Sequence, residues 1–178
     1  MVMHAVIYAC LELRAAHKLE AAMIDRVTVT GDALLEKRAD RIETNARDTR
    51  VSTHHAAAAA FLWGRAGIAE FSDPKAMSDE AAAFRSKVSA QRDDSLPQGA
   101  ARVQVRLKDG RELETTVLAA RGSLQQPLTD RDIEAKVREL VHGAGTGLDA
   151  DRVIGCVWDL DQAPNINGLL AAVVARRT

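Results

Sequence analysis

The chain has 178 residues, of which 47% are hydrophobic and 28% charged, and its 24 basic and 25 acidic side chains leave a net charge of −1. This composition is typical of a globular protein, and the balanced charge excludes a protein that binds nucleic acid through a basic surface. The longest unbroken apolar run, residues 56–63, is far shorter than the roughly 18 residues of a membrane-spanning helix. No signal-peptide pattern opens the chain.

The two cysteines, Cys10 and Cys156, both fall in apolar stretches with helical periodicity. Cysteines in that setting are typical of reduced, buried thiols. We therefore expect a cytoplasmic protein whose partners include neither a membrane nor a nucleic acid.

The first elements follow from hydrophobic spacing. Apolar residues at helical intervals predict a helix over residues 4–17, and a β-branched run predicts a strand over 24–30. Residues 31–50 are highly charged and show no clean period, so we expect mostly loop there. Because the first helix begins almost at the first residue, we also expect further protein upstream.

Residues 52–64 contain five consecutive alanines, the strongest helix formers. Ser52 suits the N-cap of this helix and Gly64 suits the position after its end. Small residues on every side let neighbouring elements approach closely, so we expect this helix to be central and buried. Another helix is expected over 78–86 and a strand over 87–91.

Residues 101–119 are expected to form a β-hairpin whose loop length fixes its register. A two-residue Asp-Gly turn is possible. A three-residue loop, 108–110, instead places Gly110 where a positive φ is needed. We predict the three-residue loop, which pairs Val105 with Leu113.

Three helices are expected at the end of the chain, over 129–141, 149–160 and 165–174, with caps at Thr129, Asp149 and Asn165. Their apolar stripes exceed what a small sheet can cover, which predicts a further partner surface. The glycine-rich residues 143–147 follow a helix rather than a strand, so we interpret them as a helix end and loop, not a dinucleotide site. The fold class is α+β, a small and mainly antiparallel sheet packed with helices over 1–122, followed by helices over 123–178.

His54 and His55 form the most distinctive polar pair. Adjacent residues on a helix diverge by about 100°, so we predict no metal site here. With Ser52 as N-cap, both histidines fall in the first helical turn, where free N–H groups and the helix dipole favour an anion. Arg50 and Thr53 would add to such a carboxylate site. Histidines that merely pack at a helix start are an equally open interpretation.

Four stretches resemble motifs of the MmgE/PrpD family, in the same order and at similar spacing. They are residues 4–9, similar to H-x-x-I-D-A with Tyr8 in place of Asp; residues 51–71, similar to F-S-x-x-Y-x-x-A-x-A-L-x-x-G-x-x-G-L-x-x-F; the turn at 108–111; and residues 120–136, similar to R-G-x-x-x-x-P-L-T/S followed by Lys. The resemblance extends from residue 4 to the end of the chain. His55 stands where the family has Tyr, and Val51 where it has Phe, so analogy does not fix the substrate.

The resemblance implies the C-terminal portion of a family that includes 2-methylcitrate dehydratase, cis-aconitate decarboxylase and iminodisuccinate epimerase. Such proteins are homodimers with a large helical domain upstream, to which the last helices return. Their activity is that of a cofactor-independent lyase or isomerase on small polycarboxylates, without metal. His4 matches the family's active-site histidine.

Two hypotheses follow. In the first, the chain is part of such an enzyme, with His4 catalytic and with substrate-binding residues in and beside one helical turn: Arg50, Ser52, Thr53, His54 and His55. In the second, it is a catalytically silent domain, or a subunit that pairs with a separately encoded helical chain. A small α+β binding module without chemistry is a third interpretation. The expected partners are a small polycarboxylate and either a second copy or a helical domain.

Overall fold

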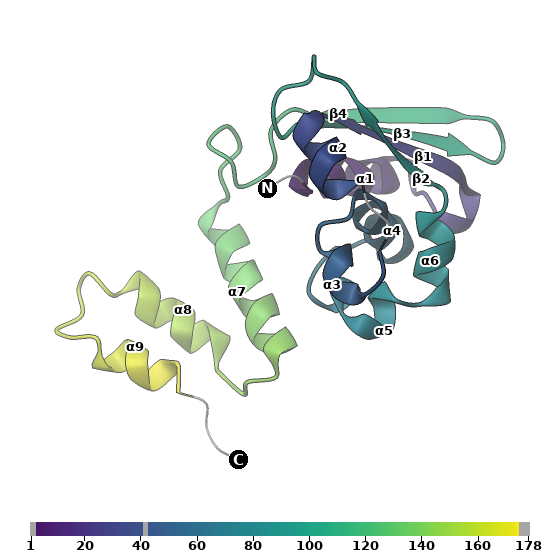
Figure 1. Cartoon of the computed structure of the whole chain (residues 1–178). Helices are drawn as coiled ribbons and strands as arrows, with labels where there is room; N and C mark the ends of the chain where they lie inside the picture. The colour runs from purple at the N-terminus through teal and green to yellow at the C-terminus, as the bar shows by residue number, and fades with distance from the viewer. Residues whose placement is uncertain (1–2, 41–42, 175–178) are drawn as a thin grey trace. The chain divides into compact units, whose positions relative to one another are not determined.

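The computed structural model describes residues 3–40 and 43–174. They form two compact units, Met1–Pro127 (unit 1) and Leu128–Thr178 (unit 2) (Figure 1). Unit 1 contains α1(His4–His17), the 3-10 helix η1(Ala21–Met23), β1(Ile24–Gly31), α2(Ala33–Ala39), α3(Ala46–Thr49), α4(Thr53–Trp63), the 3-10 helix η2(Ala69–Phe71), α5(Asp73–Ala76), α6(Asp79–Arg85), β2(Val88–Arg92), β3(Ala101–Leu107) and β4(Glu112–Val117). Unit 2 contains α7(Asp130–Ala144), α8(Ala150–Trp158) and α9(Asn167–Ala172).

The sheet of unit 1 has the strand order β2-β1-β3-β4. β1 runs parallel to β2 and antiparallel to β3, and β3 runs antiparallel to β4. The sheet is therefore mixed but mostly antiparallel, which confirms the predicted α+β class. In the hairpin, Val105 lies opposite Leu113 and Gly110 has a φ of +89°, as the three-residue loop requires.

The two faces of the sheet differ because side chains alternate along each strand. One face carries buried valines that pack against α1 and α4, which lie together on this side of the sheet (Figure 1). The opposite face is polar, and on β1, β3 and β4 its members are Arg26, Thr28, Thr30, Arg102, Gln104, Arg106, Glu112, Glu114 and Thr116. The hydrophobic core of unit 1 thus lies between the sheet and these two helices.

α4 is enclosed on all sides, as its alanine run predicts. Eight of its eleven residues are buried, including all five alanines. Ser52 accepts a hydrogen bond from the His55 backbone N–H, and Gly64 ends the helix with a φ of +67°. The Arg14 side chain of α1 donates to the carbonyl of Phe61 at this end of α4. α4 therefore begins at a side-chain cap, and its last turn accepts a hydrogen bond from α1.

The expectation of mostly loop over residues 31–50 is wrong, because α2 and α3 form there. Each begins at a capping side chain, since Asp32 accepts from the Leu35 N–H and Asn45 accepts from the Asp48 N–H. Buried Leu35 packs into the core of unit 1. Caps and tertiary packing, rather than a clean period, stabilise these short helices.

Unit 2 consists of three helices in which α7 packs on α8 and α8 on α9. The capping box at Thr129 and the cap at Asp149 are both present. Asn165 accepts from the Asn167 N–H, but α9 begins only at Asn167 and no side chain caps it. No residue of α7 is buried, so its apolar stripe stays at least partly open to solvent in this chain.

The two cysteines differ in burial. Cys10 lies fully inside the core of unit 1, and burial raises the pKa of its thiol. Cys156, on α8, is partly exposed, so the expectation of two buried thiols holds for one of them. No described helix is long and apolar enough to cross a membrane.

Candidate functional site

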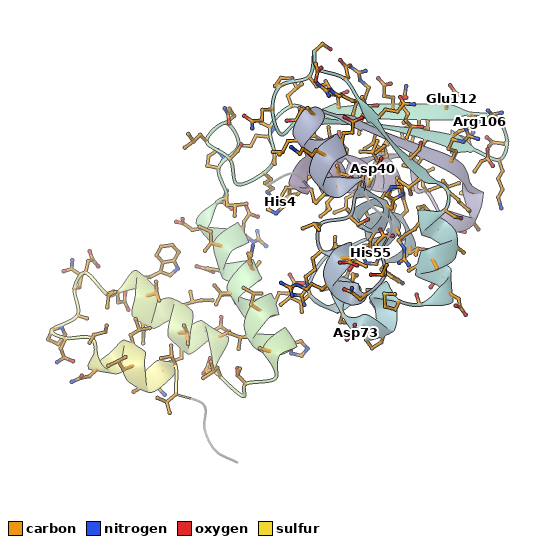
Figure 2. All side chains as sticks on the ribbon, in the orientation of Figure 1. His4, Asp40, His55, Asp73, Arg106 and Glu112 are labelled. Atoms are coloured by element: carbon orange, nitrogen blue, oxygen red, sulfur yellow. The ribbon has the colours of Figure 1, made fainter. Side chains whose placement is uncertain are left out.

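The candidate site lies where the first turns of two helices meet. The Thr53 side chain at the start of α4 lies 4.0 Å from the sulfur of Met3, the N-cap of α1. His4, the next residue and the first of α1, is half-buried. The fold thus brings Met3, the residue before the predicted catalytic His4, into contact with the predicted substrate-binding turn, about fifty residues away in sequence. Figure 2 labels His4, and also Asp40 and His55 from two further elements.

His54 is the more accessible of the two adjacent histidines. Its side chain is 20% exposed, and Nε2 lies 2.8 Å from Oδ1 of Asp40, the C-cap residue directly after α2. A carboxylate only accepts hydrogen bonds at neutral pH, so this contact favours a proton on Nε2. Asp40 therefore fixes the orientation of the His54 ring and leaves Nδ1 as the acceptor of the neutral ring.

His55 is fully enclosed. Its Nε2 lies 2.9 Å from the carbonyl oxygen of Glu70, and its Nδ1 lies 3.3 Å from a terminal nitrogen of Arg85. The ring also makes an edge contact with Phe71, with centroids 5.0 Å apart. Burial lowers the pKa of His55, and the positive charge of Arg85 acts in the same direction. His55 is consequently a packed, neutral side chain and is not accessible to a ligand.

The chain's own Glu43 lies at the start of α4, where the sequence predicted a bound anion. The Ser52 hydroxyl donates to Oε1 of Glu43, and Oε2 of Glu43 pairs with Nε of Arg85 at 3.3 Å. Both side chains are almost fully buried, with exposures of 6% for Glu43 and 11% for Arg85. Glu43 therefore supplies a negative charge where the helix dipole favours one.

A second buried carboxylate, that of Glu70, lies in the segment that contacts His55. The Glu70 side chain has no exposed area, and it accepts from Lys75 Nζ at 2.9 Å and from the Gly67 N–H at 3.0 Å. Burial raises the pKa of Glu70, but these hydrogen bonds and the positive charges of Lys75 and Arg65 outweigh it and hold the pKa below its usual range. Glu70 is thus an ionised structural group that also holds His55 through its carbonyl.

The predicted site residues therefore separate into two groups. Ser52, Thr53 and His55 are completely buried, whereas His4 and His54 are partly exposed and Arg50 is exposed. Sequence reasoning did not find Asp40, Glu43 or Arg85, which contact the turn from other elements. For Asp40 and Glu43 the charged character of residues 31–50 was the visible signal, but charge alone does not identify a partner. Among the described residues, no three His, Cys, Asp or Glu side chains come together as metal ligands.

A mixed sheet with two helices on one face, followed by three further helices, defines an α+β domain with a histidine-bearing helix junction. Residues 1–162 match the model of the MmgE/PrpD C-terminal domain. Because this match covers most of the chain, the protein belongs to the MmgE/PrpD family. The match ends before α9, whereas the motif resemblance was expected to continue to the last residue. A comparison with curated proteins finds no match.

Proposed function

We propose that this chain is the C-terminal part of a cofactor-independent lyase or isomerase that acts on a small polycarboxylate. His4 and the first turn of α4 contribute to its substrate site. Membership of the MmgE/PrpD family carries the proposal. The contact between Met3 and Thr53 supports it, because it joins the start of α1 to the start of α4.

The chemistry assigns different tasks to the two accessible histidines. Removal of a proton next to a carboxylate needs a positioned base, and the departing group needs an acid. His4 is the candidate base or acid, and His54, which Asp40 orients, is the candidate ligand for a substrate carboxylate. Exposed Arg50 adds a positive charge three residues before the α4 helix begins. Ser52, Thr53 and His55 act on the substrate only through the shape and dipole of this turn.

A denaturation experiment tests carboxylate binding. With a dissociation constant of about 5 mM, 50 mM citrate would stabilise unit 1 by about 1.4 kcal/mol. We expect this gain to shrink in His54→Ala and in His4→Ala and to persist in His17→Ala, whose side chain is exposed at the far end of α1. General salting-out by citrate acts on all variants alike. Equal gains in all four proteins would contradict the site.

Turnover tests the catalytic part of the proposal. An acid and a base must be held on both sides of the substrate, and His4 alone cannot supply both. We expect no turnover of methylcitrate, cis-aconitate or iminodisuccinate by this chain alone. Turnover that His4→Ala abolishes would contradict that expectation while supporting the role of His4.

A second function, a catalytically silent subunit, is favoured by the surface of unit 2. Its helices expose large apolar side chains, among them Val157 and Trp158, both at 48%, and Leu170 at 51%. Apolar patches of this kind mark association surfaces. We expect a dimer, or a complex with a helical chain, and a strictly monomeric sedimentation profile at tens of micromolar would count against the dimer.

A further inference from the structure

Four residues form a closed ring of polar contacts around the start of α4. The Ser52 hydroxyl donates to Glu43, and Glu43 pairs with Nε of Arg85. A terminal nitrogen of Arg85 contacts Nδ1 of His55, and the His55 backbone N–H returns to the Ser52 hydroxyl. We call Ser52, Glu43, Arg85 and His55 the α4 ring. It ties α6 and Glu43, which lies between α2 and α3, to the first turn of α4.

The partners of His55 fix its protonation state. A carbonyl oxygen can only accept, so the contact with Glu70 O requires a proton on Nε2. Arginine can only donate, so the contact with Arg85 requires a lone pair on Nδ1. The neutral ring with its proton on Nε2 is the one form that satisfies both contacts.

We infer that the α4 ring is an acid-sensitive latch, which opens when His55 takes up a proton. The new proton would sit on Nδ1 and point at the guanidinium of Arg85, which itself has no lone pair to offer. Two enclosed cations would then face each other at a contact that is now 3.3 Å long. Opening this contact breaks the α4 ring between Arg85 of α6 and His55, and leaves Arg85 linked to this turn through Glu43 and Ser52. This inference does not depend on the proposed function.

Within the described parts of the chain, the side chain in contact with Nδ1 of His55 is the cationic Arg85, which cannot accept the added proton. The negative charge of Glu43 favours a proton on His55, but both Glu43 oxygens are already engaged, by Ser52 and by Arg85. The Glu70 carboxylate of η2 is held by Lys75 of α5 and by Arg65. Burial already lowers the pKa of His55, which agrees with this arrangement.

The charged side chains named below, from the other described elements near α4, are exposed or engaged with partners outside the α4 ring. On α3, Arg47 is exposed and Asp48 bonds to Thr44 and Asn45. Asp73 of α5 is exposed, and Arg14 of α1 binds the opposite end of α4 through Phe61 O. His54, next in the chain, contacts Asp40.

The direction of the pH dependence follows from linkage. Because the folded state holds His55 neutral, the unfolded chain binds the proton first as the pH falls through about 6.5, the ordinary value for histidine. The stability that the α4 ring contributes is therefore fully present above this pH. It is lost progressively as the pH falls from there toward the lowered pKa of folded His55. Between pH 7 and pH 5 the unfolding equilibrium constant rises by up to about 25-fold from this residue alone.

Urea unfolding between pH 7 and pH 5 tests the latch in a Trp158→Phe background, where Trp63 is the remaining tryptophan and reports on unit 1. In His55→Gln the amide can donate to Glu70 O and accept from Arg85 without titrating, so most of the 25-fold rise should disappear. The matched control His17→Gln, at an exposed position, should keep it. An equal rise in all three proteins would overturn the inference.

Nitrogen NMR of the unmutated chain gives an independent result should His55→Gln fail to fold. The His55 ring should show a proton on Nε2 and none on Nδ1 at pH 6.5, the ordinary pKa of the histidine side chain. A protonated His55 ring at pH 6.5, or a neutral ring with its proton on Nδ1, would overturn the inference.

Discussion

Unit 1 and unit 2 use helices in opposite ways. α4 of unit 1 is apolar almost all round, and neighbouring elements enclose it. In α7 of unit 2, by contrast, seven of the fifteen residues are charged and none is buried. A helix that is apolar on every side must be surrounded, while a helix with one apolar stripe needs a single further surface. Unit 1 thus provides its own core, and unit 2 carries apolar side chains that an additional surface can cover.

The largest expected difference between the two units is in the free energy of unfolding that each loses when one apolar side chain is truncated to alanine. Phe61 is buried at 1% exposure and stacks on Phe84, with ring centroids 5.9 Å apart. Phe61→Ala should lower the free energy of unfolding of unit 1 by about 3–5 kcal/mol. Leu170→Ala, at an exposed position of α9, should cost less than about 1 kcal/mol. Urea unfolding of both variants measures the two losses in free energy of unfolding. Equal losses would contradict the claim that unit 1 buries its apolar side chains more completely than unit 2.

A pair of glycine substitutions should act in opposite directions. Gly64 has a φ of +67°, and an added Cβ would lie 2.4 Å from a guanidinium nitrogen of Arg14, so Gly64→Ala should destabilise unit 1 by about 1–2 kcal/mol. Gly143 lies within α7 and a Cβ there meets nothing within 4 Å, so Gly143→Ala should stabilise α7 by up to about 1 kcal/mol. Thermal unfolding followed by circular dichroism distinguishes them, and a stabilised Gly64→Ala would contradict the packing at this end of α4.

The N-cap residues of α4 and α7 differ in their further hydrogen bonds. Ser52 caps α4 and also donates to buried Glu43, so Ser52→Ala should cost about 2 kcal/mol. Thr129 forms an exposed capping box with Asp132, so Thr129→Ala should cost about 1 kcal/mol or less. Urea denaturation compares the two changes directly. A cost at Thr129 larger than that at Ser52 would argue against the buried ring.

The smallest effect is expected on the surface of unit 2. Arg138 pairs with Asp151 at 2.7 Å and with Glu134 at 3.2 Å, but all three side chains are at least partly exposed. Solvent and salt screen such pairs, so Arg138→Ala should leave the thermal midpoint unchanged within error at 0.5 M salt. A large loss at that salt concentration would show that unit 2 depends on this cluster.

The hairpin and α4 show what the sequence could predict. The parity of the strands and the need for a positive φ at Gly110 fixed the pairing of Val105 with Leu113, because both are local constraints. Ser52, the alanine run and Gly64 likewise defined α4 from its own residues. Thus His54 and His55 were placed correctly in the first turn of a buried helix.

The partners of that turn were beyond sequence reasoning for a physical reason. Glu43 and Arg85 are nine and 33 residues from Ser52, and only the packing of α6 and of the residues after α2 onto α4 brings them together. Asp40 lies in a charged segment, and the sequence alone does not show which of the carboxylates there contacts His54. The caps at Asp32 and Asn45 were readable signals for α2 and α3, but the absence of a clean period concealed them.

The most direct test of the proposed site is a citrate titration followed by NMR of the histidine rings, since the chain has five histidines in distinct settings. Partly exposed His54 and His4 should shift together with a single dissociation constant in the millimolar range, while His142 of unit 2 should not move. His55, enclosed by Glu70 O, Arg85 and Phe71, should shift far less than its neighbour. Shifts confined to His17 or His142, with His4 and His54 silent, would contradict a carboxylate site at the junction of α1 and α4.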